Sequence, residues 1–454
     1  MKLKSKRKDL TKGDLKKQIL LMTLPMILGM LGMVIFNFVD ALYIGKLGET
    51  ELAAIAFTFP VVLVVQSISQ GLSMGTGSVV SRFVGGKNEA WVKKTSTYSL
   101  ILSLFIVAVF SIIGNLTIEP LFKAMGATKA EMPYIKSYMR IWYLGMPFVV
   151  FPMVGNNIIR ALGDTKIPSL VMTFAALINI ILDPILIFGW GFNGLGISGA
   201  AIATVFARMM TFIAATIILS KREKVLSFKD LHFKEFLKSC KSVLYIAVPT
   251  ALTRGIIPIG MGVITALIAS FGSLDVAGYG AGVKIENLGI SAINALSVVM
   301  VAVVGQNYGA KNFDRIKKGY KIASGYSLIY SLIILPLFFF LAPLLSKLFD
   351  VSQAIRDVII LYIRLSLIGI GFFGVLNISS SLLNAIRKPI IATLLFLIEM
   401  FGLYIPCAFI LSKFYGTVGV FYGLIIAYVV SGVIAFFITN KIINKQISTR
   451  DLSG

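Results

Sequence analysis

The sequence contains few acidic residues, few cysteines and almost no histidine. Its 454 residues include 20 Asp and Glu against 43 Lys and Arg, two Cys and one His. The two cysteines, Cys240 and Cys407, cannot form a disulfide framework. The single His232 lies in a polar connector, where we expect a solvated side chain and not a metal ligand.

Apolar residues dominate the composition of the chain. Charged residues make up only 14% of the chain, hydrophobic residues make up 57%, and the mean hydropathy is +0.89. No soluble domain of this length has such a composition, so we predict an all-α polytopic membrane protein. The net charge of +23 would suggest a nucleic-acid partner in a soluble chain. Here the basic residues lie between apolar runs, so we expect a lipid bilayer as partner and no nucleic acid.

About 20 apolar residues are needed for each helical span, and the sequence provides twelve such runs. They are residues 18–45, 52–82, 95–121, 133–160, 167–190, 195–220, 242–271, 277–306, 319–347, 357–385, 389–413 and 418–441. The N-terminal tail, the alternate connectors that follow it and the C-terminal end hold 31 Lys and Arg, against 7 in the other connectors. By the positive-inside rule, both termini are cytoplasmic. The basic N-terminus leads into a run too long for a signal peptide, so we expect an uncleaved anchor in the inner membrane.

The chain also contains an internal repeat. A shift of 224 residues places Pro25 on Pro249, Lys87 on Lys311 and Tyr138 on Tyr362, and the match extends over about 135 residues. Each half holds six spans, so both halves enter the membrane in the same direction and form a parallel repeat, as in transporters. The expected parts are a tail (1–17), an N-lobe (18–220), a linker (221–241), a C-lobe (242–443) and a second tail (444–454). The linker is either a short amphipathic helix on the inner surface or a plain solvated segment.

The first span carries one acid, Asp40, within an apolar run. An ionised carboxylate there costs about 2.5–3.5 kcal/mol and by default marks a functional site. One helical stripe leads to it, in steps of three or four residues: Met22, Met26, Met30, Met33, Asn37 and Asp40. Methionines alone would suggest core packing, but the amide and acid at the end of the stripe favour a binding pocket. Flexible thioethers suit ligands of different shapes, so we expect this stripe to contact substrate.

The fifth span carries Asn179 and Asp183 on one helical face, and Pro184 follows directly. Asp40 and Asp183 lie at similar depth, and two close carboxylates in a poorly solvated pocket disfavour joint ionisation. We therefore expect this pair to load a proton or a Na⁺. Pro25, near the cytoplasmic end of the first span, is the expected hinge.

Four charged residues are embedded in the spans of the second half: Arg254, Lys284, Glu286 and Glu399. Lys284 and Glu286 are two residues apart and point to different faces of a helix. The simplest interpretation is a structural ion pair between helices, with Glu399 as the partner of Lys284. The sequence does not assign these four residues a functional role.

At this point the sequence resembles the multidrug and toxic compound extrusion (MATE) family, and most of all its DinF-type branch. The resemblance covers the whole chain and depends on FNFVDALYIGKLG (36–48), ELAAIAF (51–57), RALGDTKIPS (160–169), LINIILDPILIFGWGFNGLGISGAAIAT (177–204), GYGAGVKIENL (278–288) and VGQNYGA (304–310). It implies two six-helix lobes in a V shape and cation-coupled export of amphipathic, mostly cationic compounds by a membrane transporter, not an enzyme. We expect a monomer without cofactors.

The resemblance also implies site residues. In the branch that this chain resembles, a cation site uses residues that correspond to Asp40, Asn179, Asp183 and Thr204. The coupling ion is H⁺ or Na⁺, and these four would be metal ligands only for Na⁺. The expected substrate contacts are Met26, Met30, Met33, Asn37, Asp40 and Asn156. The other branch carries acids on spans 7 and 10, where this chain has none, which argues against a coupling site in the second lobe.

Two other functions were weighed against export. An intramembrane aspartyl protease resembles a Tyr-Asp and Gly-x-Gly-Asp pair, whereas Val39 precedes Asp40 and Leu182 precedes Asp183. A lipid-linked saccharide flippase of related architecture handles an anionic headgroup and should line its cavity with several Arg or Lys. The N-lobe, as the sequence presents it, is acidic with methionine and aromatic neighbours, which favours cationic substrates.

Overall fold

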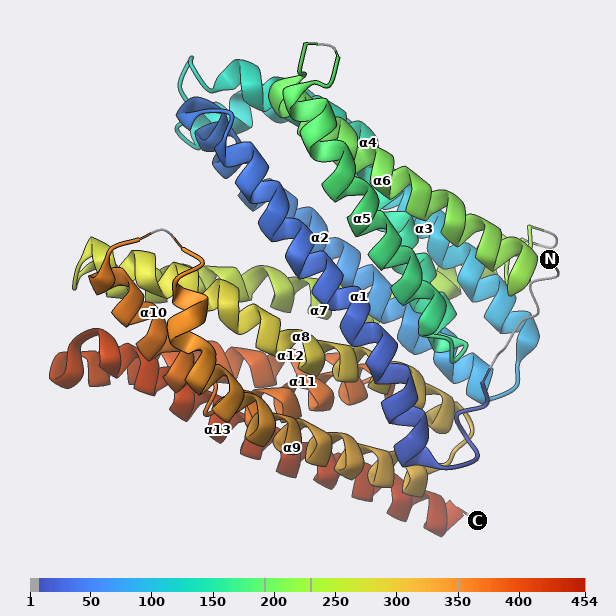
Figure 1. Ribbon diagram of the computed structural model, residues 1–454. Helices are drawn as coiled ribbons and strands as arrows, with labels where there is room; N and C mark the ends of the chain where they lie inside the picture. The colour runs from blue at the N-terminus through green and yellow to red at the C-terminus, as the bar shows by residue number, and fades with distance from the viewer. Residues whose placement is uncertain (1–7, 192, 229–230, 350, 454) are drawn as a thin grey trace. The chain divides into compact units, whose positions relative to one another are not determined.

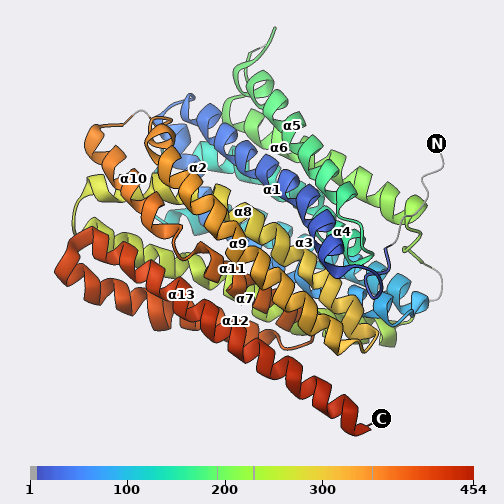
Figure 2. The ribbon, with the colours of Figure 1, turned by 60° about the horizontal axis from the view of Figure 1, so that its bottom comes forward.

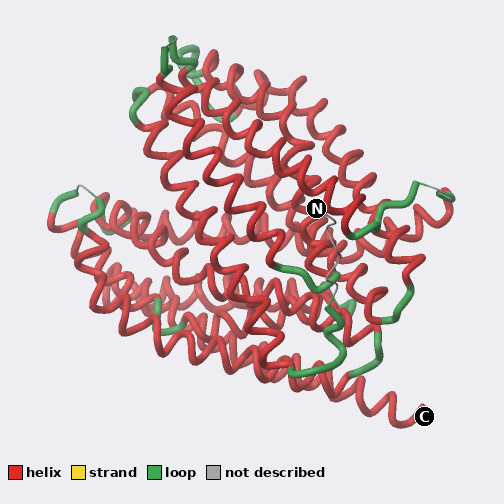
Figure 3. Tube along the Cα trace, turned by 45° about the vertical axis from the view of Figure 1, so that its right-hand side comes forward, coloured by secondary structure: helices red, strands yellow, loops and turns green. Residues whose placement is uncertain are grey.

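The computed structural model describes residues 8–191, 193–228, 231–349 and 351–453. These residues form helices and connecting loops, with no strand among them (Figure 3). The all-α prediction is confirmed. In a membrane this outcome has a physical cause, because a helix satisfies every backbone hydrogen bond within its own segment.

The described helices provide the predicted spans. Ten helical stretches are individually long and apolar enough to cross a membrane. One further pair, 353–366 and 370–385, passes this test together and is bent by 57°. The last stretch, Pro389–Thr449, contains Gly416 in a non-helical conformation (φ 57°, ψ −139°) and so divides into two. Counted in this way, the described residues supply all twelve spans.

The chain forms two compact units that are not continuous in sequence. Unit 1 contains Lys8 and residues 25–251, and unit 2 contains residues 9–24 and 252–454. The domain limits expected from sequence order therefore differ from the observed units at two places. The first third of the first helix (15–24) belongs to unit 2, and the start of the seventh belongs to unit 1.

Unit 1 is built around its fourth helix. Its helices are α1 (Leu15–Gly45, from Pro25 onward), α2 (Glu49–Gly85), α3 (Glu89–Ala124), α4 (Met132–Ala161), α5 (Lys166–Phe188), α6 (Gly196–Ile217) with the π-helix η1 (Ile218–Arg222), and the first part of α7 (Phe233–Ala269). α4 packs against α2, α3 and α6, and α5 packs against α6 (Figure 1). Large buried side chains of α4, including Trp142, Met146 and Phe151, form much of the core. This packing fixes α5 and α6, the helices that carry the candidate site.

Unit 2 repeats this plan with α8 and α11 at its centre. Its further helices are α8 (Ser273–Gly309), α9 (Phe313–Ser346), α10 (Gln353–Ser366), α11 (Ile370–Ala385), α12 (Pro389–Leu397), the π-helix η2 (Ile398–Tyr404) and α13 (Ile405–Ser453). α8 packs against α9, α10 and α11, and α11 also packs against α13 (Figure 2). Part of the expected N-terminal tail belongs here. Leu10 is fully buried, and its backbone N–H donates to Gln306 Oε1 at 3.0 Å.

The backbone repeats along with the sequence. Gly48 and Gly272, 224 residues apart, begin α2 and α8 with φ of 148° and 154°. Lys87 and Lys311, at the same offset, both have φ in the left-handed region, at 54° and 56°. A non-glycine residue rarely adopts that conformation. Its recurrence at equivalent turns confirms that the two halves are structural repeats.

The linker is neither of the two forms expected from sequence. Its beginning belongs to η1, and α7 begins at Phe233. Arg222 Nη2 lies 2.8 Å from Asp164 Oδ2, and Lys94 Nζ lies 2.6 Å from Glu235 Oε2. These ion pairs tie both ends of the linker to other parts of unit 1, so its described residues have specific partners.

Glycine allows α2 and α7 to approach closely within unit 1. A Cβ at Gly71 would lie 2.4 Å from the Ala247 carbonyl oxygen, and one at Gly75 would lie 2.5 Å from that of Val243. The two glycines are four residues apart and therefore on one face of α2. This is the small-xxx-small arrangement by which membrane helices bring their backbones together.

We expect Gly75→Ala to lower the free energy of unfolding by about 1–3 kcal/mol, because the new methyl group meets a backbone atom that cannot move aside. Gly77→Ala is the matched control on the same helix, since its Cβ would lie 3.6 Å from the nearest atom, in Asn157. Thermal melting of the purified protein in detergent measures both. Equal melting temperatures for the two variants would show that α2 and α7 separate freely.

Candidate functional site

Two carboxyl groups meet inside unit 1. Asp183 on α5 is fully buried, and Asn179, one turn earlier, donates from Nδ2 to Asp183 Oδ1 at 3.3 Å. The Asp40 carboxyl on α1 lies beside that of Asp183, close enough to share a hydrogen bond. The structure thus brings together acids that are 143 residues apart in the printed sequence.

Three oxygen atoms of this group lack a partner. Asp40 Oδ1, Asp183 Oδ2 and Asn179 Oδ1 are all buried without a hydrogen bond among the described residues. Buried acceptors without donors are costly, so the group needs a proton or a cation to be complete. Carboxylate and amide oxygens are hard ligands that fit an alkali ion as well as a proton. Within the described part of the chain, no cluster of three His, Cys, Asp or Glu side chains could hold another kind of metal.

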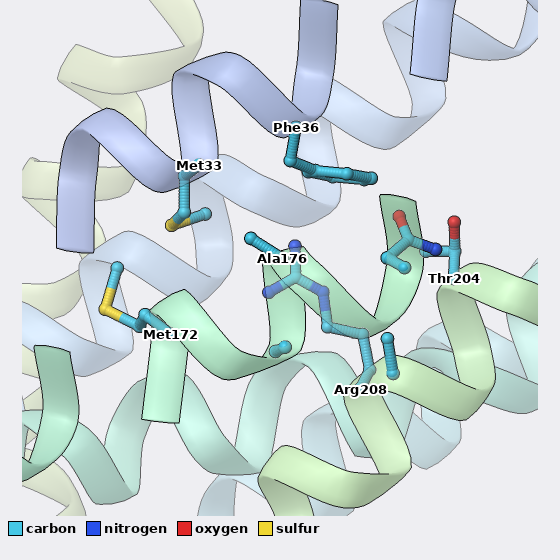
Figure 4. Close-up of a pocket in the computed structure, with 9 residues that line it drawn as sticks. Met33, Phe36, Met172, Ala176, Thr204 and Arg208 are labelled. Carbon is cyan, nitrogen blue, oxygen red and sulfur yellow. The ribbon is translucent and has the colours of Figure 1, made fainter. Parts of the chain in front are cut away.

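A pocket of about 280 Å³, counted with its open mouth, adjoins the acid pair (Figure 4). It is lined by Met33 and Phe36 of α1, by Met172, Ala175, Ala176 and Asn179 of α5, and by Thr204, Ala207 and Arg208 of α6. Asn179 is shared between the pocket and the carboxylates. Thr204 therefore lies at the same site as the other three residues expected for cation coupling.

Two residues at this site were missed by the sequence analysis. Tyr138 on α4 is an electrostatic neighbour of both Asp40 and Asp183. Its repeat equivalence to Tyr362 was visible in the sequence, but its proximity to the acids was not. Arg208 lines the pocket with its guanidinium group. The description of this lobe as simply acidic is therefore wrong, because Arg208 lies within the predicted span 195–220.

The expected substrate contacts separate in the structure. Met33 lines the pocket. Met26 is fully buried and accepts a 3.4 Å hydrogen bond from Ser169 Oγ, so it packs the core and does not face the pocket. Asn156 is also buried, with Oδ1 unpartnered, and lies outside the pocket lining. The side chain of Asn37 is outside the described residues.

The remaining stripe residue and the expected hinge lie on the same helix. Met30 is half-buried. Pro25 lies inside α1, which continues through it without interruption. The span is therefore not broken at Pro25 in this structure, although the chain changes units there.

The expected ion pair between Lys284 and Glu399 is wrong. Lys284 is exposed on α8, whereas Glu399 is buried on η2, beside Glu286. Glu286 accepts a hydrogen bond from Tyr362 at 2.6 Å and a longer one from Tyr428 at 3.4 Å. Tyrosine hydroxyls therefore satisfy this buried acid.

Comparisons with known proteins agree with the repeat. The MatE family model matches residues 25–185 and again residues 249–410, with starting points 224 residues apart. The FAD transporter of Shewanella oneidensis is 33% identical over 438 residues, which cover 96% of this chain and 97% of that protein. The multidrug export protein MepA of Staphylococcus haemolyticus is 25% identical over 94% of each chain. The Vibrio cholerae MATE transporter VcmN, solved in a bent form, superposes with a TM-score of 0.89 at 28% identity, over 95% of this chain and 98% of that chain.

We expect Tyr362→Phe to destabilise unit 2 by about 1–3 kcal/mol, since it removes the short hydrogen bond to a buried carboxyl group. Tyr428→Phe removes only the 3.4 Å contact and should cost less. The two substitutions change the same atom in the same kind of side chain, so their difference reports the hydrogen bonds alone. A larger loss of melting temperature for Tyr428→Phe would contradict the assignment.

Proposed function

The chain belongs to the MatE family of membrane transporters and is not an enzyme, and we propose that it exports amphipathic, mostly cationic compounds in exchange for H⁺ or Na⁺. Export would proceed by alternating access between the two sides of the membrane. The observation that carries this proposal is the acid pair with Asn179, whose three buried oxygens lack hydrogen-bond partners among the described residues. Such a group is incomplete until a cation binds, which is what coupling requires.

The coupling step follows from charge. With the pair ionised, Asp40 and Asp183 attract a cationic substrate into the adjoining pocket. A proton or Na⁺ held by Asp40, Asn179, Asp183 and Thr204 removes that attraction and expels the substrate. We propose that the same event bends α1 at Pro25, where the chain changes units. The bent form named for the Vibrio cholerae relative supports such a motion in the family.

The substrate class is supported by the pocket and by the relatives. Met33, Met172 and Phe36 offer adaptable apolar contacts to ligands of varied shape. The name of the Staphylococcus relative favours multidrug export, whereas that of the Shewanella relative favours a flavin nucleotide. A lipid-linked saccharide flippase remains the alternative. It is less favoured because Arg208 is the one basic residue among the nine that line the pocket.

The membrane arrangement is part of the proposal. Basic residues concentrate in alternate connectors and at both ends, which favours cytoplasmic termini in the inner membrane. We propose a monomer, since each chain carries its own acid pair and pocket within unit 1. No cofactor is needed beyond the coupling ion.

Asp40→Asn is expected to abolish efflux driven by an ion gradient, because an amide neither takes up a proton nor neutralises Na⁺. Fluorescent cationic dye efflux from proteoliposomes, with proton and sodium gradients imposed separately, measures this loss and identifies the coupling ion. Asp275→Asn, at the start of α8, is the control and should transport normally. Full activity of a correctly inserted Asp40→Asn protein would refute the coupling role.

The affinity for a cationic dye should fall as pH drops, or as Na⁺ rises, because cation loading removes the negative charge that attracts the dye. Dye binding to the purified protein between pH 5 and 8, at constant ionic strength, shows whether the affinity rises or falls with pH. Asp40→Asn should make the affinity nearly independent of pH and of Na⁺. A wild-type dye affinity that changes with neither pH nor Na⁺ would show that the coupling cation and the dye do not compete.

A further inference from the structure

Arg208 places a positive charge at the centre of the unit 1 pocket. It lies one turn after Thr204 on α6, and its guanidinium group extends toward Ala176, between Met172 and the side chains of Met33 and Phe36 (Figure 4). A guanidinium group within a membrane span is costly and is retained where it has a partner or a function.

No acidic side chain among the described residues pairs with Arg208. The described ion pairs of unit 1 involve other residues. The acid pair and the guanidinium group therefore carry separate charges at one site, where Asn179 donates to Asp183 and also lines the pocket with Arg208.

A second guanidinium group lies behind the pocket wall. Arg160 of α4 is 9% exposed, and its Nε has no hydrogen-bond partner among the described residues. Its Nη2 lies 3.2 Å from the sulfur of Met172, and Met172 also lines the pocket beside Arg208. Two guanidinium groups without acidic partners thus adjoin one methionine, and this end of the pocket is electropositive.

We propose that Arg208 binds the anionic group, a phosphate or a carboxylate, of an aromatic substrate whose ring packs against Met33, Phe36 and Met172. The planar guanidinium fork matches both groups with two parallel hydrogen bonds. Thioethers and an aromatic ring supply the apolar contacts for the flat portion. The inference rests on the proposed export function and adds phosphorylated or zwitterionic aromatic compounds to its substrates.

The lining of the pocket comes from three helices. The residues that contact the ring and the residue that contacts the anion lie on different helices, α1 and α5 against α6. A ligand with both features would therefore contact all three helices.

The test compares riboflavin with flavin mononucleotide, which share one ring system and differ by a phosphate. Quenching of flavin fluorescence on titration with the purified full-length protein gives both affinities. We expect the wild type to bind the phosphorylated compound about tenfold more tightly than riboflavin. Arg208→Gln should reduce the ratio of the two affinities to about one, and Arg208→Lys should retain part of the preference.

Arg140→Gln, at an exposed position on α4, is the matched control and should keep the full preference. Equal binding of the two flavins by the wild type would overturn the proposal, and this comparison needs no variant to fold. A preference that survives in Arg208→Gln would also overturn it. Cationic dye efflux is measured separately on the wild type. Equal flavin affinities in the wild type with intact efflux reject the Arg208 subsite alone, and absent efflux with a preserved phosphate preference in the wild type rejects the export proposal alone.

Discussion

The lack of water in a bilayer interior is the constraint on which this structure depends. Each polar group placed there needs a partner within the protein. Unit 2 meets the requirement at Glu286 with hydroxyls of Tyr362 and Tyr428. Unit 1 meets it only in part, because Asp40 and Asp183 keep buried oxygens without partners. The same physical rule therefore separates the hydrogen-bonded Glu286 from an acid pair that can take up a cation.

The repeat extends this contrast. Tyr138 and Tyr362 occupy equivalent positions, and each lies beside buried acids in its own unit. The acids themselves are not equivalent in sequence, since they come from α1 and α5 in unit 1 and from α8 and η2 in unit 2. One repeated helix arrangement thus holds buried acids at different places in the two units. The covalent chain passes between the units after Lys8 and again inside α1 and α7, so a relative movement would also bend these two helices.

The unit 1 pocket carries both signs of charge within a small volume. Arg208 lies among the thioethers and the phenyl ring of the lining, and Asn179 connects the pocket to the adjoining carboxyl groups. Because charged groups act strongly at low dielectric, small changes in protonation of these carboxyl groups alter what the pocket attracts. A site of this kind can discriminate substrates by the position of their charges as well as by their sign.

The sequence by itself determined the spans, the repeat and the shared face of Asn179 and Asp183, because hydrophobic length, a constant offset and helical periodicity can be read without knowing how the helices pack. Asn179 and Asp183 share a face for that reason, and their hydrogen bond follows directly. Tertiary structure decided which side chains meet across helices, since that depends on how each helix is rotated and packed. It placed Met33 in the pocket but Met26 in the core, separated Lys284 from Glu399, and brought Arg208 to the centre of the site. Periodicity gives the face of one helix, and only packing shows what that face contacts.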